Sequence, residues 1–395
     1  MALLGTVILG GCQKEPSKEG LTDNQKQMKA AVEQYVPNVV YSTYKALADE
    51  TQGLYELLAA ASKKGVNSIT DNDINAICSK FLAARTYWEQ SEAFLYGPAT
   101  TFGIDPHIDT WPLDAEALAV ALSNTAQMEM LKGEDGIAYA GAKLGAELLG
   151  FHGIEFILFR NGKNRTAAAL KANEDHEAFE GMTVTGEQEL IYATAVAGDL
   201  RDNCYRLYAS WNPDAEAKYT DRIDEIEAEI EINGKIYGAN MLGAAALGSS
   251  FETWEEVLST ILVGGCSNIC AEVADVKMGN AHTGEDVNYI ESPYSEKSFQ
   301  DFIDNILSIQ YSLYGKAGAT APQAKSLINV LKSYKYDGAD ALQNKLSASI
   351  AALKVCQDKG AFVDIYQDDS VQDAMDVIND LDDELNKAAD WIVKQ

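Results

Sequence analysis

Apolar residues recur at helical spacing over long stretches of this chain, and proline rarely interrupts them. From residue 23 to 64, for example, Met28, Val32, Tyr35 and Val39 begin a pattern with intervals of three and four residues. Only 8 of the 395 residues are proline, well under half the usual share of roughly 5%. Because proline ends helices more effectively than any other residue, this pattern predicts an all-α protein.

The chain is long enough for two domains, since one domain usually takes roughly 100–200 residues. A charge-rich passage at 213–235 divides the helical patterns into two series of about four helices. We therefore expect an N-terminal helical bundle at 23–212 and a C-terminal helical bundle at 213–395. A solvated helix face inside a single domain is an equally good interpretation of the charged passage.

The two halves share one small feature. Trp88-Glu89 and Trp254-Glu255 both precede an irregular loop that contains proline. Two matching residues are weak evidence, but they raise the hypothesis of an old duplication. In the second half, the pattern around Trp254 predicts one long apolar helix over 240–278.

The charge balance limits the partners. The sequence has 31 Lys and Arg against 60 Asp and Glu, a formal net charge of −29. A surface this acidic repels phosphate backbones, so we do not expect a nucleic acid partner. Beyond the N-terminus no run approaches the ~20 continuous apolar residues of a transmembrane helix.

The first residues resemble a bacterial lipoprotein signal. An apolar run ends in Leu9-Gly10-Gly11-Cys12, and a polar segment follows. The resemblance implies that residues 1–12 are a signal peptide with an acylated Cys12, that 13–22 is a tether, and that the protein is lipid-anchored in the cell envelope, at the periplasm or the outer-membrane surface. No basic residue precedes Cys12, and the alternative is an apolar terminus of a cytosolic protein.

The remaining cysteines show no disulfide or zinc-site spacing. We interpret them as small buried core residues. They are Cys78, Cys204, Cys266, Cys270 and Cys356.

A histidine and a glutamate occupy an apolar helix predicted over 137–159. His152 and Glu155 are three residues apart, hence on one face, and residues 148–159 contain no other charged side chain. Burying a lone carboxylate costs several kcal/mol, so Glu155 needs a cation, a metal or dense hydrogen bonding. Gly150 and Gly153 flank the histidine, which indicates that a backbone or a ligand approaches closely. The alternative is a His–Glu pair that only fixes helix register.

A second group of polar and aromatic residues begins where an earlier helix ends. Trp88, Ser91 and Glu92 share a helix face, and the proline-rich loop that follows carries Asp109 and Trp111. Loops of this kind often carry function.

These motifs together resemble the imelysin family. Residues 150–155, Gly-Phe-His-Gly-Ile-Glu, match its G-x-H-x-x-E motif, and the passages at 91–98, 109–114 and 291–295 are similar to its other motifs. The resemblance covers essentially the whole mature chain. It implies two helical bundles with a site between them in a protein associated with bacterial iron uptake, whereas the family name records a metallopeptidase.

With the resemblance, we expect a mononuclear metal site. Its predicted ligands are His152, Glu155, Glu92 and Asp109, a hard, oxygen-rich set that suits iron and, as the alternative, zinc. The predicted supporting residues are Trp88 and Trp111 as apolar walls, Gly150, and Ser91, Glu291, Ser292 and Ser295 as sources of hydrogen bonds. The tryptophans as plain core, and the acids as ordinary caps, stay open as alternatives.

The function expected is binding of a metal ion or chelated metal for iron uptake, with a permease or outer-membrane receptor as partner and the membrane contacted only through the lipid. The alternative is a metal-dependent peptidase in which Glu155 or Glu92 activates a metal-bound water. Phe156 follows Glu155 where a two-histidine zinc motif would have its second histidine. The remaining histidines, His107, His176 and His282, are predicted in loops, and we interpret His107 and His282 as surface residues, although His107, just before Asp109, could reach the site. A third possibility is a structural or adaptor lipoprotein without metal.

Overall fold

The structure is a computed structural model that describes residues 20–133 and 135–395. The predicted signal peptide, Cys12 and most of the tether lie outside the described residues. Within the described part, strands are limited to the hairpin of β1 (Phe159–Arg160) and β2 (Lys163–Asn164). The all-α prediction is confirmed.

The helices of the first half are α1 (Asp23–Tyr35), α2 (Ser42–Lys64), α3 (Asp71–Glu89), α4 (Pro98–Thr101), α5 (Asp105–Asp109), α6 (Ala115–Ser123), α7 (Thr125–Lys132), α8 (Gly136–Lys143), α9 (Gly150–Leu158), α10 (Ala167–Lys171) and α11 (Gly186–Trp211). Those of the second half are α12 (Ala217–Glu225), α13 (Tyr237–Leu242), α14 (Trp254–Ser259), α15 (Asn268–Ala271), α16 (Gly279–Thr283), α17 (Ser298–Tyr314), α18 (Leu327–Ser333), α19 (Ala339–Lys359), α20 (Phe362–Ile365) and α21 (Asp369–Ile392). Wider π-helical turns are η1 (Val36–Tyr41), η5 (Thr260–Ser267) and η6 (Glu272–Met278), and short 3-10 turns are η2 (Glu92–Phe94), η3 (Ala146–Leu148) and η4 (Glu177–Phe179).

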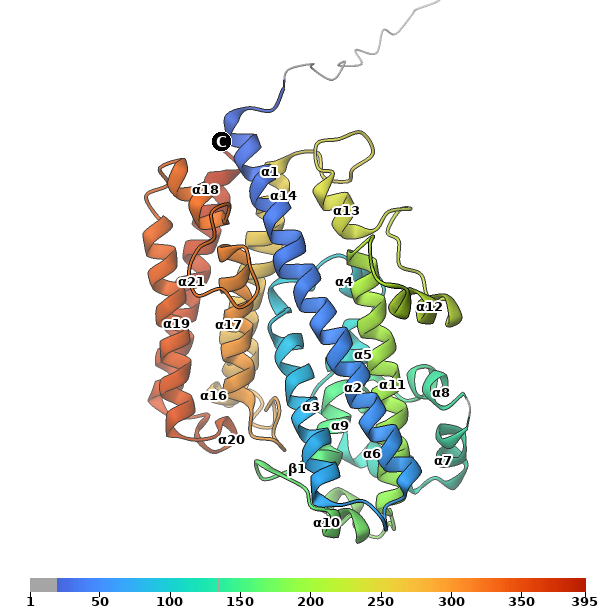
Figure 1. The fold of residues 1–395 in the computed structure, drawn as a ribbon. Coiled ribbons are helices and arrows are strands. Elements are labelled where there is room, and N and C mark those ends of the chain that lie inside the picture. Colours follow the sequence, from blue (N-terminus) through green and yellow to red (C-terminus); the bar gives the residue numbers. More distant parts are fainter. Residues whose placement is uncertain (1–19, 134) are drawn as a thin grey trace, which may run out of the picture.

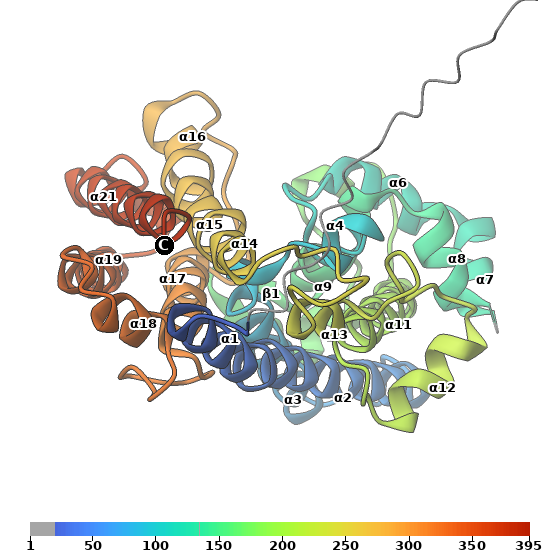
Figure 2. The ribbon, with the colours of Figure 1, turned by 90° about the horizontal axis from the view of Figure 1, so that it is seen from above.

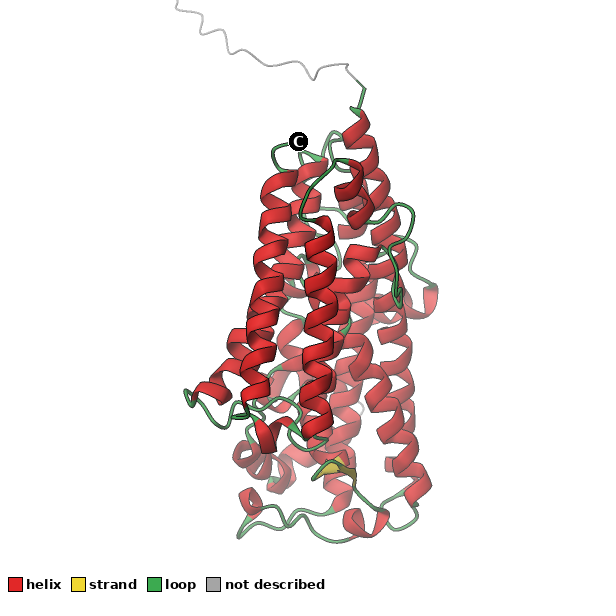
Figure 3. Cartoon of the chain, turned by 90° about the vertical axis from the view of Figure 1, so that its left-hand side faces the viewer, coloured by secondary structure: helices red, strands yellow, loops and turns green. Residues whose placement is uncertain are grey.

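The long helices run roughly parallel to one another in two groups (Figures 1 and 3). In one group α2 packs against α3 and α11, and in the other α19 packs against α17 and α21. Viewed from above, α1 lies between the groups, where it contacts α14 and α18 (Figure 2). The first half of the chain therefore reaches into the second, and the domain boundary at residue 213 stays a prediction.

The predicted apolar helix at 240–278 begins later than expected. A loop follows α13, and Thr253 caps the next helix by accepting a hydrogen bond from the Glu256 amide at 3.1 Å. From Trp254 the helix continues to Thr283. It is long and apolar enough to cross a membrane, but 61% of its most apolar window is buried in the fold, where it packs against α21. Its apolar character is explained by this packing.

The predicted helix at 137–159 is wrong as a continuous element. It is divided into α8, η3 and α9, because the backbone is extended at Gly145 and Leu149 and has φ of +66° at Gly150. A Cβ atom on Gly150 would lie 2.0 Å from the carbonyl oxygen of Ile108 in α5. The close approach predicted for Gly150 is therefore a backbone contact, and it places His152 in the first turn of α9.

The five described cysteines after the N-terminal segment are buried and free, which confirms their interpretation as core residues.

Candidate metal centre

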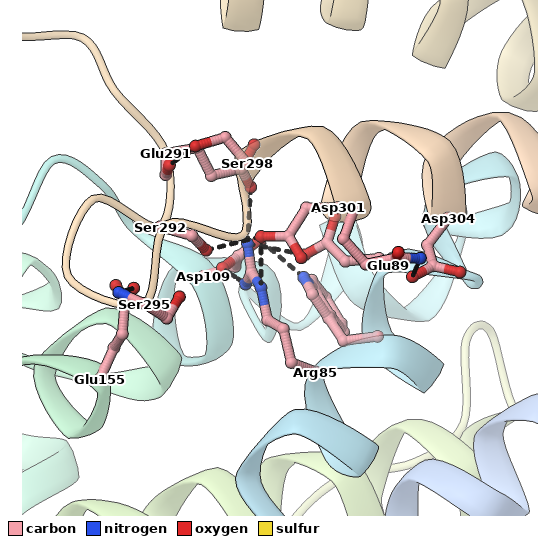
Figure 4. Close-up of polar contacts among 12 residues, drawn as sticks. Arg85, Glu89, Asp109, Glu155, Glu291, Ser292, Ser295, Ser298, Asp301 and Asp304 are labelled. Carbon is pink, nitrogen blue, oxygen red and sulfur yellow. Dashed lines mark hydrogen bonds and ion pairs between the residues drawn. The ribbon is translucent and has the colours of Figure 1, made fainter. Parts of the chain in front are cut away.

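The predicted motifs meet in a buried polar cluster built from both halves of the chain. Helices α3, α5 and α9 and turn η2 supply it from the first half, and η6, α17 and the segment before α17 supply it from the second. Figure 4 shows part of the cluster, with the Arg85 guanidinium pointing among the carboxylates and Glu155 to one side.

Arg85 lies at the centre of the cluster and is 3% exposed. Its Nη2 atom lies 2.7 Å from Glu89 Oε1 and 2.6 Å from Glu291 Oε1, and its Nε atom lies 3.4 Å from Asp301 Oδ2. Arg85 also pairs with Asp109. One guanidinium thus connects four carboxylates from four segments, namely α3, α5, the segment before α17 and α17 itself, an arrangement for which its planar fork of donors is suited.

Asp109, at the end of α5, connects Arg85 to the predicted histidine. The Trp88 indole donates a hydrogen bond of 2.7 Å to Asp109 Oδ2, while Asp109 Oδ1 lies 3.0 Å from His152 Nε2. Burial raises the pKa of Asp109, but the Arg85 charge outweighs burial and holds the pKa well below its usual value. The Asp109 carboxyl therefore favours its ionised form.

His152 is buried between two carboxylates. Its Nε2 atom is close to Asp109 but not aligned for a hydrogen bond, and its Nδ1 atom lies 3.7 Å from Glu155 Oε2. Glu155 in turn accepts a hydrogen bond of 2.7 Å at Oε1 from the backbone amide of Ser295. Burial lowers the pKa of His152, but the two carboxylates outweigh burial and raise it to about 9.

A buried lysine supplies the second fixed cation. Lys277 Nζ lies 3.2 Å from Glu291 Oε1, 3.8 Å from Glu89 Oε2 and 3.9 Å from Glu92 Oε1. It belongs to the π turn η6, whose hydrogen bonds span five residues rather than four. This wider turn brings Lys277 and Glu272, five residues apart, to the same cavity.

A cavity of about 230 Å³ adjoins the cluster. Its charged lining consists of Glu92, Asp105, Asp109, Glu272 and Lys277, and the rest is Leu95, Thr110 and Trp111. The Trp111 ring stacks on Tyr289 with centroids 3.9 Å apart and lies 6.4 Å from the His152 ring. The cavity is thus an acidic chamber with an aromatic wall.

The ligand atoms of three residues converge as a metal site requires. One atom each from Asp109, His152 and Glu291 lie within 4.8 Å of one another. Among the described residues, His152 Nε2 and Glu291 Oε2 are buried without a hydrogen-bond partner. Buried polar atoms without partners are costly, so the donor set fits a cation. Glu155, a predicted ligand, is outside this convergent group, and Glu291, predicted only to support it, is inside.

Burial changes the pKa values of the other carboxyl groups in the cluster. Burial raises the pKa of Glu89 and of Glu92 well above the usual value, and it raises that of Asp301 to about 7. The raised pKa values mean that these buried carboxyls favour the neutral, protonated form unless more positive charge is brought near them. A bound metal ion would supply the missing positive charge.

The predicted supporting residues have more specific roles than expected. Trp88 is a hydrogen-bond donor as well as a wall, and Ser292 Oγ donates to Asp301 Oδ2 at 2.5 Å. Ser295 contributes its backbone amide rather than its hydroxyl. The expected helix face shared by Trp88, Ser91 and Glu92 is wrong, because α3 ends at Glu89; Ser91 follows it and donates to the carbonyl of Trp88.

Three central residues were missed from the sequence: Arg85, Glu89 and Lys277. Arg85 and Glu89 follow Phe81 at intervals of four residues, so both lie on the buried stripe of α3. Lys277 lies in a mostly apolar helix. In both helices, a charged residue at an otherwise apolar, buried position was the sequence feature that could have identified these residues.

The remaining histidines lie away from the cluster. His107 is in α5 rather than a loop, is partly buried, and pairs with Asp199 at 3.0 Å. His282 is in α16 and half-buried, with Nδ1 at 2.7 Å from the carbonyl oxygen of Tyr366. The prediction of loop positions at the surface is wrong for both, because each finds a partner on a neighbouring segment. His176 precedes η4 and accepts a hydrogen bond from the Ala178 amide.

Comparison with known proteins identifies similar chains. The family model for imelysin, peptidase family M75, matches residues 40–388. Iron-regulated protein A of Synechococcus elongatus is 23% identical over 274 residues, which are 69% of this chain and 61% of that protein. The chain thus spans less than two thirds of this relative.

Two crystal structures share the fold. One, of a putative iron-regulated protein A precursor from Parabacteroides distasonis, has a TM-score of 0.75 and 23% identity, covering 95% of this chain and 97% of the other. The second, of an imelysin-like protein from Psychrobacter arcticum, has a TM-score of 0.59 and 13% identity, covering 91% and 93%.

Proposed function

This chain belongs to the imelysin family, and from that premise we propose that it binds a metal ion, preferentially iron, through Asp109, His152 and Glu291. The observation that carries the proposal is the convergence of these three ligand atoms, with His152 Nε2 and Glu291 Oε2 buried and lacking hydrogen bonds among the described residues. Glu155 and the Ser295 amide behind the imidazole orient it toward Asp109.

The ligand chemistry supports iron over a soft thiolate metal. One imidazole with carboxylates is a hard donor set, and the described cysteines are buried in the core elsewhere. The name of the Synechococcus relative, iron-regulated protein A, supports the same choice. Zinc is the alternative cation, because imidazole and carboxylate also suit it.

The proposal includes the location of the protein and its partner. We infer a cell-envelope lipoprotein anchored through Cys12, with a permease or outer-membrane receptor as the partner that delivers or accepts the metal. The acidic cavity of about 230 Å³ supports capture of a cation from solution. A metallopeptidase of the two-histidine type has less support, because His152 is the one histidine of the described residues that lies in the cluster.

Calorimetric titration tests the metal site. The purified protein is titrated with Fe(II) without oxygen, and with Zn(II), beside the variants His152→Ala and Glu291→Gln. We expect binding to weaken at least a hundredfold in His152→Ala, because the imidazole is the one nitrogen ligand. His282→Ala is the matched control, since its partner is the Tyr366 carbonyl.

Loss of binding in His152→Ala with retention in His282→Ala supports the proposal. No binding by the folded wild-type protein, or binding that His152→Ala leaves unchanged, overturns it. A peptide-hydrolysis assay on the loaded protein separates the peptidase alternative.

A further inference from the structure

We propose that the cluster holds two cations that share Asp109, the second of them bound by Glu89, Glu92 and Asp109 through oxygen atoms alone. The inference deepens the proposed function and rests on it, because Asp109 is common to both sites.

Of three sets of converging atoms in the cluster, the set of Glu89, Glu291 and Asp301 is paired with Arg85, and the other two share Asp109. Atoms of Asp109, His152 and Glu291 lie within 4.8 Å of one another, and so do atoms of Glu89, Glu92 and Asp109. Asp109 has two carboxylate oxygens and belongs to both sets. A carboxylate in this position can bridge two ions, as carboxylates do in di-metal centres of helical bundles.

The carboxylates of the second set are buried and incompletely paired. Glu92 is 8% exposed, lines the cavity, and accepts no hydrogen bond from the described residues. Its nearest cation is Lys277 Nζ, at 3.9 Å. Glu89 is fully buried, and its Oε1 atom lies 2.7 Å from Arg85 Nη2 without the alignment of a hydrogen bond. A buried carboxylate oxygen that lacks a donor is stabilised by a metal ion.

The formal charges match two divalent ions. Six buried carboxylates lie next to Arg85, Lys277 or His152: Glu89, Glu92, Asp109, Glu155, Glu291 and Asp301. The fixed cations among them are Arg85 and Lys277. With a neutral, metal-binding imidazole, four negative charges remain, and two divalent cations supply four positive charges. One divalent cation would offset half of these formal charges.

The cavity gives the second site access to solvent ions. Glu92 and Asp109 line it directly, together with Asp105, Glu272 and the cation Lys277. At about 230 Å³ it has room for an ion with several water molecules. An all-oxygen site with retained water suits hard cations such as Mn(II), Mg(II) or Fe(II) rather than thiolate-preferring metals.

The test counts Mn(II) bound to the full protein. Equilibrium dialysis followed by elemental analysis gives the number of ions per chain, and electron paramagnetic resonance shows whether the bound ions are coupled. We expect two Mn(II) per chain and a spin-coupled signal. Glu92→Gln should bind one ion, with the hyperfine pattern of isolated Mn(II). This variant should fold normally, because Glu92 makes no hydrogen bond with the described residues.

Matched variants keep the outcomes distinct. Asp304→Asn is the control, since Asp304 is a buried carboxylate outside both sets that is held by Gln90 and Gln300; it should retain two coupled ions. One ion in the wild-type protein, removed by His152→Ala but not by Glu92→Gln, overturns the second site and leaves the proposed function standing. Two ions that Glu92→Gln does not change also overturn it. Failure of His152→Ala to remove any ion overturns the proposed function instead.

Discussion

Replacing Gly150 with alanine tests whether the close contact between α9 and α5 holds the site together. Gly150 has φ of +66°, and a Cβ atom there would lie 2.0 Å from Ile108 O and 2.4 Å from Ile108 C. Ile108 directly precedes Asp109, and His152 is two residues beyond Gly150. The substitution therefore pushes apart the two segments that carry the Asp109 and His152 ligand atoms.

Two effects should lower the free energy of unfolding of the Gly150→Ala variant. A residue with a side chain in the left-handed region costs roughly 1–2 kcal/mol relative to glycine. Overpacking against a backbone that must shift adds roughly 1–3 kcal/mol. We therefore expect Gly150→Ala to lower the free energy of unfolding by about 2–5 kcal/mol. The contact is with backbone atoms, which cannot move aside as the end of a flexible side chain does.

A second glycine serves as a control that measures only the free-energy cost of the left-handed conformation. Gly103 has φ of +60°, and a Cβ atom on it would have nothing within 4 Å. Gly103→Ala should therefore cost only the roughly 1–2 kcal/mol of the left-handed conformation. Urea unfolding followed by circular dichroism gives both free energies, and metal titration of both variants shows the effect on the site. If Gly150→Ala costs no more than Gly103→Ala and binds metal normally, the contact does not position the ligands.

Three further predictions concern side chains. Glu155→Gln keeps the size of the residue but removes the charge behind the imidazole, so titration should show metal affinity reduced roughly 10- to 100-fold; unchanged affinity contradicts an orienting role. Lys277→Met leaves buried carboxylates without their cation, so the apo protein should lose roughly 3–5 kcal/mol of stability, and Mn(II) should raise its melting temperature more than that of the wild type; an equal increase argues against the charge balance. The carboxylate of Asp199 raises the pKa of His107 while burial lowers it, and the net shift is upward. The native state then binds the proton more tightly, so this stabilisation is full below the unfolded pKa of about 6.5 and disappears as pH rises through the folded pKa. The difference in unfolding free energy between wild type and His107→Gln should be larger near pH ~5.5 than near pH ~8.5, and equal differences refute the pair.

Local patterns in the sequence determined most of the secondary structure. The apolar periodicity at 23–64 predicted the helices that form there, α1 and α2, because helix formation depends on neighbours three and four residues apart. The same patterns failed at 137–159. The chain there is apolar throughout, and the break at Gly150 depends on Ile108, a residue of another helix.

The predicted ligands His152, Glu155, Glu92 and Asp109 lie in one buried cluster, because a buried charge in an apolar helix must find a partner. The identity of that partner was not encoded locally. Glu291 enters the convergent group instead of Glu155.

Only the tertiary structure determined which carboxylates pair with the buried cations Arg85 and Lys277. Arg85 meets Glu291 and Asp301 from more than 200 residues away in sequence, and Lys277 faces the same carboxylates from a π turn. Electrostatic interactions depend on distance in space and on burial, and neither follows from spacing along the chain. The sequence determined that a helical protein would bury a His–Glu motif, whereas the packing of its two halves determined which oxygens and nitrogens face one another.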